Sequence, residues 1–123
     1  MPVLIVDTSS ILFAMSNHKD VFGIIKDEMP ARNAVISQGI VNELTSIARK
    51  STKNSKYARV AISLLNRHSN IKIEPDSTYV DGWIMRAAEA LSCAVCTNDT
   101  KLKKALRLKN IKVYSISRNG TLV

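Results

Sequence analysis

SCAVCTNDTKLKKALRLKNIKVYSI, residues 92–116, is the stretch that decides the fold. Its apolar run from Cys93 to Thr97 has the length and composition of a buried strand. Helical spacing rich in lysine follows from Thr100 to Leu108, and a second strand is expected from Lys112 to Ile116. Asp99 lies where the first strand ends and the helix begins. Its carboxylate could cap the helix or act at the edge of a sheet.

The same alternation of strand and helix extends over the rest of the chain. Further strands are expected at Val3–Val6, at Ala34–Ser37 and around Ile71 and Ile73. Helical spacing runs from Ser9 or Ser10 to Met15, Asp20 to Met29, Gly39 to Lys50, Lys56 to His68, and Asp76 or Ser77 to Leu91. Parallel strands need crossover connections, which are usually helical, so this order predicts an α/β fold with helices on both faces of a parallel sheet.

Length and charge restrict the class of protein. The 123 residues fit a single domain, and no repeat or linker divides them. Eighteen Lys and Arg against ten acids give a net charge of +8, which favours a polyanionic partner: nucleic acid, an anionic membrane surface or an acidic protein. Few aromatic residues accompany the basic clusters, so contact with backbone phosphate is the better interpretation. No segment approaches the about 20 apolar residues that cross a bilayer, and the N-terminal stretch lacks a basic leader, so we expect an intracellular, cytoplasmic protein.

Four acids occupy positions that suggest chemistry. Asp7 and Asp99 follow expected strands, at the edge where parallel sheets bind ligands. Glu43 and Asp81 lie near the apolar stripes of their helices, where an unpartnered carboxylate is costly. The four could converge in one crevice and offer oxygen ligands to Mg²⁺ or Mn²⁺. Alternatively, the first two could cap helices, and the other two could pair with Arg or Lys on neighbouring elements.

Other reactive residues fit ordinary structural roles. Cys93 and Cys96 lie three apart on an expected strand and face opposite sides, which predicts buried thiols rather than a redox pair. His18 is expected in a surface turn, and His68 at a helix end, where it would interact with the helix dipole. The sequence contains no P-loop, GxGxxG or nucleophile elbow.

Four short motifs resemble those of the PIN-domain ribonucleases in order and approximate spacing. They are VDTSS (6–10), IVNEL (40–44), YVDGWIMRAA (79–88) and CTNDTKLKKAL (96–106). The last motif, with the strand expected after it, is similar to the archaeal and eukaryotic branch that processes small-subunit ribosomal RNA. The resemblance covers nearly the whole chain and departs from the family in Ser9, where many members carry asparagine, and in Gly82.

This resemblance implies a fold, a metal site and a reaction. The fold would be a Rossmann-like three-layer α/β/α sandwich around a parallel sheet of about five strands. Asp7, Glu43, Asp81 and Asp99 would hold one or two Mg²⁺ or Mn²⁺ ions, supported by the hydroxyls of Ser9 and Thr97. Metal-activated water would hydrolyse an RNA phosphodiester. Two basic segments would attract RNA, with Arg49, Lys50, Lys53, Lys56 and Arg59 in one and Lys101, Lys103, Lys104, Arg107 and Lys109 in the other. Each lysine could equally belong to a solvated helix face.

Residues 1–123 are therefore expected to form a single PIN-like nuclease domain, a metal-dependent endoribonuclease acting on ribosomal RNA precursors. Two alternatives remain open. One is the ribonuclease toxin of a toxin–antitoxin pair, whose small antitoxin would insert a charged residue into the crevice. The other is a non-catalytic RNA-binding scaffold. PIN domains often dimerise, so a homodimer is a further expected partner.

Overall fold

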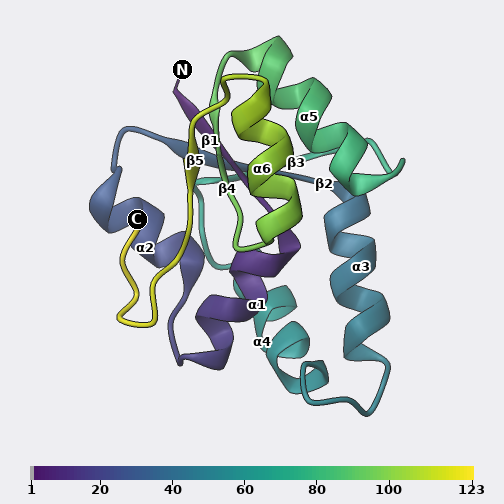
Figure 1. Cartoon of the computed structure of the whole chain (residues 1–123). Helices are drawn as coiled ribbons and strands as arrows, with labels where there is room; N and C mark the ends of the chain where they lie inside the picture. Colours follow the sequence, from purple (N-terminus) through teal and green to yellow (C-terminus); the bar gives the residue numbers. More distant parts are fainter. Residues whose placement is uncertain (1) are drawn as a thin grey trace.

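The computed structural model describes residues 2–123 and places five parallel strands in one sheet with the order β3-β2-β1-β4-β5 (Figure 1). In the central strand β1, Leu4 lies opposite Ala34 of β2 and Ala94 of β4. The sheet confirms the predicted parallel α/β fold. The strands are β1 (Val3–Val6), β2 (Asn33–Ser37), β3 (Ile71–Glu74), β4 (Ala94–Cys96) and β5 (Val113–Tyr114).

Six helices among the described residues complete the three-layer sandwich. They are α1 (Thr8–Ser16), α2 (Val21–Glu28), α3 (Gln38–Ala48), α4 (Ser55–Leu65), α5 (Val80–Leu91) and α6 (Thr100–Leu108). The chain moves outward from β1 through β2 to β3 and then returns to β4 and β5. Because crossovers between parallel strands are right-handed, α1 to α4 cover one face and α5 and α6 the other. The resulting arrangement is the α/β/α sandwich that the resemblance implied (Figure 1).

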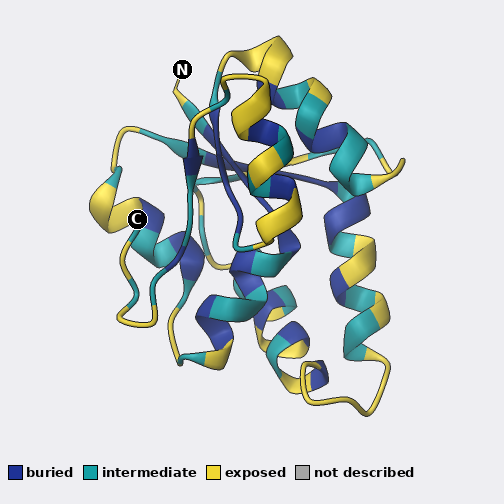
Figure 2. Ribbon diagram, in the orientation of Figure 1, coloured by how far each residue is buried: buried dark blue, intermediate teal, exposed yellow. Residues whose placement is uncertain are grey.

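The core lies on both sides of the central strand. Leu4, Ile5 and Val6 of β1 have no exposed surface, and Ile40 and Ile84 from opposite helix layers are equally buried. Figure 2 shows buried residues along the strands and exposed ones on the outer helix faces. Each large aliphatic side chain removed from water contributes about 1.5–3 kcal/mol, so the apolar strand runs seen in the sequence stabilise the sheet.

Several element ends differ from the prediction because local side chains intervene. Helix α1 begins at Thr8 rather than after Ser9 or Ser10. Helix α5 begins only at Val80, because Asp76 Oδ1 accepts hydrogen bonds from Thr78 N and Oγ1 and so closes a turn instead of capping a helix. Strand β5 covers only Val113–Tyr114, and α4 ends at Leu65.

His68 lies just past a helix end, as expected, and has a partner that the sequence did not indicate. His68 follows the end of α4, and its Nε2 forms a short hydrogen bond with Asp20 Oδ2. Oδ1 of the same aspartate accepts a bond from Phe22 N and caps α2. His68 therefore connects the α4–β3 loop to the start of α2. The expectation that Asp20 opens a helix is confirmed.

The cysteines are free thiols, as expected, but their burial differs. Cys96 is completely buried in β4, whereas Cys93 precedes the strand and is only partly buried. Burial raises the pKa of the Cys96 thiol to about 12. Burial also raises the pKa of Cys93, with the nearby Arg32 partly opposing the effect.

No helix within residues 2–123 combines the length and apolar character that crossing a bilayer requires.

Candidate active site

The candidate site lies at the carboxyl edge of the sheet, where β1 and β4 are neighbours and the chain reverses its direction through the sheet. Asp7 immediately follows β1, and its backbone N–H donates to Cys96 O of β4 over 2.9 Å. Asp99 follows β4 and opens α6. Glu43 of α3 and Asp81 of α5 approach the same edge from the two helix layers. The fold thus brings the four predicted acids to one side of the molecule.

Asp7 is 6% exposed, and its carboxylate is held by two hydroxyls. Ser9 Oγ and Thr97 Oγ1 donate to Asp7 Oδ2 over 2.7 and 2.8 Å. Although Asp7 occupies the N-cap position of α1, its side chain makes no capping bond to that helix, so the capping alternative is wrong. Within residues 2–123, Oδ1 accepts no hydrogen bond. The structure therefore brings both predicted supporting hydroxyls to the acid and leaves one oxygen for another ligand.

Asp99 caps α6 and also faces the site. Its Oδ1 accepts a hydrogen bond from Leu102 N over 2.9 Å, which is the capping role considered for it. Its backbone N–H donates to Thr97 Oγ1 over 3.1 Å. The residue is exposed and lines the same hollow as Glu43 and Asp81. Capping occupies Oδ1 of Asp99, and within residues 2–123 Oδ2 accepts no hydrogen bond.

Glu43 extends from α3 toward the crevice and keeps an exposed side chain. Thr8 Oγ1 at the start of α1 donates to Glu43 Oε1 over 3.0 Å. Partial desolvation raises the pKa of Glu43; the hydrogen bond from Thr8 opposes this, and the negative charges of Asp7 and Asp81 add to it. Glu43 therefore lies in the electrostatic field of two other acids.

Asp81 lies in the first turn of α5 and is half-buried. Desolvation raises its pKa, and repulsion from Asp7 and Asp99 raises it further, while a long bond of 3.5 Å from Tyr79 opposes the shift. A close approach at Gly39 brings α3 near the segment before α5, because a Cβ there would lie 3.2 Å from Thr78 O. This contact sets the separation of the two helices that carry Glu43 and Asp81.

The alternative that basic residues neutralise Glu43 and Asp81 is wrong. Three ion pairs occur in the described part of the chain, His68–Asp20, Lys72–Glu74 and Lys109–Glu89, and none includes an acid of the site. Hard oxygen donors without cationic partners are the ligand type that suits Mg²⁺ or Mn²⁺. As the side chains of residues 2–123 are arranged, however, no three His, Cys, Asp or Glu gather tightly enough to hold an ion. The metal ligand set stays a prediction.

Two residues of the site escaped the sequence analysis. Thr8 positions Glu43, as described above. Asn98 accepts hydrogen bonds through Oδ1 from Ser10 Oγ and Ile116 N, and its Nδ2 donates to Ile116 O. These bonds fix the loop that carries Asp99. Both residues belong to the quoted motifs, and their small polar side chains beside the acids were the available signal.

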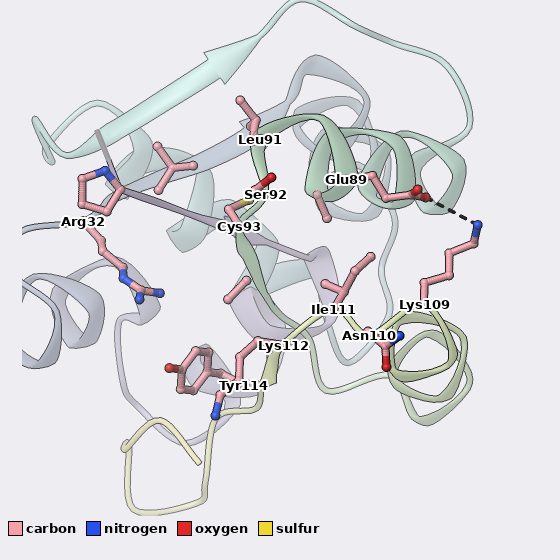
Figure 3. A pocket seen from close by; sticks show the side chains of 14 residues that line it. Arg32, Glu89, Leu91, Ser92, Cys93, Lys109, Asn110, Ile111, Lys112 and Tyr114 are labelled. Carbon is pink, nitrogen blue, oxygen red and sulfur yellow. Dashed lines mark ion pairs between the residues drawn. The ribbon is translucent and has the colours of Figure 1, made fainter.

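The acidic crevice is not the largest hollow of the described structure. A hollow of about 700 Å³ is lined by Glu43, Asp81 and Asp99. One of about 760 Å³ lies at the opposite end of the sheet and contains none of the four acids; Figure 3 shows Arg32, Cys93, Lys109, Lys112 and Tyr114 around it. We assign the candidate chemistry to the smaller hollow, because that is where the acids converge.

The predicted RNA-binding residues fall into two separate regions. Arg49, Lys50, Lys53 and Lys56 surround the connection between α3 and α4. Lys101 and Lys104 are exposed on α6, whereas Lys103 is partly buried. Neither region lines the acidic crevice itself. A nucleic acid would have to extend beyond the acids to contact either group.

The chain is similar to proteins of known family in sequence and in fold. It is 27% identical to "Ribonuclease VapC9" of Archaeoglobus fulgidus over 110 residues, 89% of this chain and 78% of the relative. The solved PIN domain endonuclease Utp24 superposes with a TM-score of 0.77 at 22% identity, over 98% of this chain and 90% of that one. VapBC-1 from nontypeable Haemophilus influenzae matches with a TM-score of 0.60 at 20% identity, over 90% of this chain and 96% of that one. The family model described as "PIN like domain" matches residues 4–119, and the chain therefore belongs to the PIN-domain ribonuclease family.

Proposed function

We propose that residues 1–123 form one nuclease domain that uses divalent metal to cut RNA internally, and that its substrate is a ribosomal RNA precursor inside the cell. One observation carries the proposal: four acids that have no cationic partner within residues 2–123 approach one crevice in a protein of net charge +8. Carboxylates at the carboxyl edge suit a metal ion, and the surrounding positive charge suits a polyanion.

Carboxylate oxygens are the donors that suit one or two Mg²⁺ or Mn²⁺ ions, and the acids would have to draw closer together than in this structure to bind them. The ligands would be Asp7, Glu43, Asp81 and Asp99. A bound ion would lower the pKa of its coordinated water toward neutrality and so supply hydroxide for the attack on phosphorus. Ser9 and Thr97 hold Oδ2 of Asp7, and within residues 2–123 Oδ1 accepts no hydrogen bond.

Other contacts hold the remaining acids in place. Thr8 fixes one oxygen of Glu43, and the α6 cap fixes one oxygen of Asp99. These bonds restrain the carboxylates of Glu43 and Asp99 and leave the second oxygen of each for a metal ion. The hydrolysis would leave 5′-phosphate and 3′-hydroxyl ends.

The choice of RNA rests on sequence similarity. The relative of Archaeoglobus fulgidus is named a ribonuclease. The ribosomal precursor is proposed because the CTNDTKLKKAL motif and the strand after it resemble the branch of the family that processes small-subunit ribosomal RNA. The match to Utp24, at 22% identity, supports the fold that this assignment requires.

The test compares wild type with Asp7→Asn and Asp99→Asn. Structured ribosomal precursor and unstructured RNA are offered with Mn²⁺, and the product ends are mapped. We expect each variant to lose cleavage by about a hundredfold or more, because one ligand charge is removed. Asparagine caps helices as well as aspartate does, so Asp99→Asn retains the start of α6.

Asp27→Asn, which neutralises an exposed acid on α2, is the matched control and should cut like wild type. Undiminished cutting by both site variants would refute the proposal. Calorimetry that detects no Mg²⁺ or Mn²⁺ binding would favour the non-catalytic scaffold instead. Preference for the unstructured RNA would argue against a ribosomal substrate.

A ribonuclease toxin is the second candidate, favoured by the 27% identity to VapC9. Its antitoxin would place a cationic side chain among acids that have no cationic partner within residues 2–123. Expression of the wild type should then arrest growth, and Asp99→Asn should not. Normal growth together with accurate cutting of ribosomal precursor would exclude this role.

A further inference from the structure

Three hollows follow one another along helix α3. The first is lined by Glu43, Asp81 and Asp99 of the candidate site and also by Asn42 and Ser46. The same two residues line a second hollow of about 460 Å³, which extends to Lys50. Lys50 in turn lines a third hollow of about 510 Å³, formed by the connection between α3 and α4. Shared lining residues make the three hollows neighbours in a row, which we call the α3 track.

The exposed face of α3 changes from acidic to basic along this track. Asn42, Thr45, Ser46 and Arg49 are spaced as i, i+3, i+4 and i+7 and therefore share one face. Gln38 Nε2 donates to Asn42 Oδ1, which leaves the amide nitrogen of Asn42 as a donor. From Glu43 to the end of α3 at Ala48 the helix rises by about 7.5 Å, and Lys50 follows two residues later. Acidic, neutral and basic side chains thus follow one another along α3 over a distance that a few nucleotides of RNA would span.

The basic end of the track has a fixed shape. Ser55 is 1% exposed, and its Oγ accepts a hydrogen bond from Thr52 N over 3.0 Å. Arg59 Nη1 donates to Ala48 O over 2.8 Å, which ties α4 to the last turn of α3. Lys50 and Lys53 are exposed around this ordered connection. Cations held on an ordered frame lose little backbone freedom when they bind phosphate.

We propose that the α3 track holds the single-stranded RNA that flanks the scissile phosphate on one side, with Lys50, Lys53 and Lys56 as its phosphate-binding cations. This inference rests on the proposed nuclease function. It adds the route that the RNA follows across the surface and the single-stranded form in which the RNA binds. Acids repel phosphate, so the affinity has to come from cations farther along the strand. Lys101 and Lys104 line none of the three hollows and are not part of the track.

A single strand suits this geometry better than a duplex. Asp7 is only 6% exposed, and a flexible backbone can bend toward it more readily than a stiff A-form helix. The track carries one aromatic residue, Tyr57, beneath Lys56. Contacts with phosphate rather than with bases therefore predominate, and binding along the track is independent of sequence.

The first test places a negative charge in the middle of the track. Ser46→Glu alters an exposed helix position where glutamate is a good helix former, so folding is preserved. We expect the affinity for single-stranded RNA, measured by anisotropy in the Asp99→Asn background, to fall by about tenfold or more, because the added carboxylate repels phosphate along the track. Ser63→Glu, at an exposed position on α4, is the matched control and should leave the affinity for RNA unchanged.

The second test removes the cations. Lys50→Gln/Lys53→Gln/Lys56→Gln is compared with Lys26→Gln/Lys112→Gln/Arg118→Gln, which loses the same three charges at exposed sites away from the track. Binding of fluorescent single-stranded RNA to each set is measured in the Asp99→Asn background by anisotropy. We expect the track set to bind at least about tenfold more weakly and to lose about two units of the salt slope, since each phosphate contact contributes roughly 0.7. The control set should change by less than about threefold.

The outcomes separate this proposal from the nuclease assignment. If wild type cuts RNA with Mn²⁺ while Ser46→Glu and the track set behave like their controls, the track is refuted and the nuclease survives. If no RNA is cut but both track changes weaken RNA binding, the nuclease fails and the track survives. Stronger loss of binding from Lys101→Gln/Lys104→Gln than from the track set, or tighter binding of duplex than of single strand, would also overturn the track.

Discussion

Thr97 donates a hydrogen bond from Oγ1 to Oδ2 of Asp7 over 2.8 Å and so joins the end of β4 to the end of β1. Oγ1 of Thr97 also accepts a hydrogen bond from the backbone N–H of Asp99 over 3.1 Å. Thr97 has no exposed surface. One buried hydroxyl therefore sets the positions of two acids that lie at opposite ends of the sequence.

Replacing Thr97 with valine should impair both stability and cleavage. The variant keeps the shape of the side chain but loses a bond to a charged group, which we expect to cost about 2 kcal/mol in urea unfolding. Cleavage should fall by about tenfold or more because Asp7 loses one of its two hydroxyl donors. Thr97→Ser retains the hydroxyl and should keep most of the activity. Equal activity of the valine variant and wild type would contradict this role of Thr97.

Glu43→Gln should raise the melting temperature of the protein in EDTA and abolish the further rise that Mn²⁺ is expected to cause. Glutamine keeps an oxygen that can accept the bond from Thr8 but removes the repulsion from Asp7 and Asp81 that helps to raise the pKa of Glu43. For this exposed position we expect a gain of about 0.5 kcal/mol, or roughly 2 °C in melting temperature. Calorimetric melting with and without Mn²⁺ measures both effects. A lower melting temperature in EDTA would show that repulsion is not important.

Gly39→Ala should reduce cleavage with little loss of stability. The new Cβ would lie 3.2 Å from both Thr78 O and Val80 Cγ2, so the start of α3 must move away from the segment that leads into α5. Alanine compensates by favouring the helix by about 1 kcal/mol. We expect a loss of cleavage of about tenfold, because Glu43 and Asp81 separate, and a melting temperature within a few degrees of wild type. Unchanged cleavage would mean that this contact does not position the acids.

Thiol chemistry should distinguish the two cysteines. The thiolate is the reactive form, and with a pKa of about 12 only about one Cys96 in ten thousand is ionised at pH 8 in the folded protein. Iodoacetamide at that pH should therefore label Cys93 alone, more slowly than a free thiol, and should label Cys96 only in urea. Mass spectrometry of the peptides measures both. Labelling of Cys96 at the rate of Cys93 in folded protein would contradict its burial.

The same shift predicts a dependence of stability on pH. The folded protein keeps the Cys96 proton up to a pKa of about 12, whereas the ordinary pKa of a thiol is 9.0, so this contribution is fully present below pH 9 and is lost between pH 9 and 12. Cys96→Ala should lose less stability than wild type across that interval. Parallel pH profiles of urea unfolding for the two proteins would exclude the effect.

The sequence predicted best the features that depend on neighbouring residues. The apolar run of β1 ending at Asp7 and the cap of α6 by Asp99 are local patterns, and the structure has both strand and cap where they were expected. The parallel sheet followed from the alternation of these elements. The positions of Glu43 and Asp81 relative to one another could not follow, because Gly39 sets them through a contact with a different part of the chain.

Side chains that bond across the fold account for the errors. The partner of His68 is Asp20, which no local pattern could identify. Strand β5 is shorter than predicted because Ser115 Oγ donates to Thr97 O, and Ile116 N to Asn98 Oδ1, so side-chain bonds replace the ladder beyond Tyr114. These same bonds hold the loop that carries Asp99. The regular strand pairing therefore ends beside the candidate site.

The edge strand β3 also bears on how the protein behaves at high concentration. Its unpaired backbone edge and the 43% exposed Ile73 could template association with another copy, but the Lys72–Glu74 ion pair places charge along that edge and Pro75 ends the strand. Concentrated salt screens such charges. We therefore expect aggregation during storage to begin at this edge, and Ile73→Lys to delay it without affecting the opposite side of the sheet.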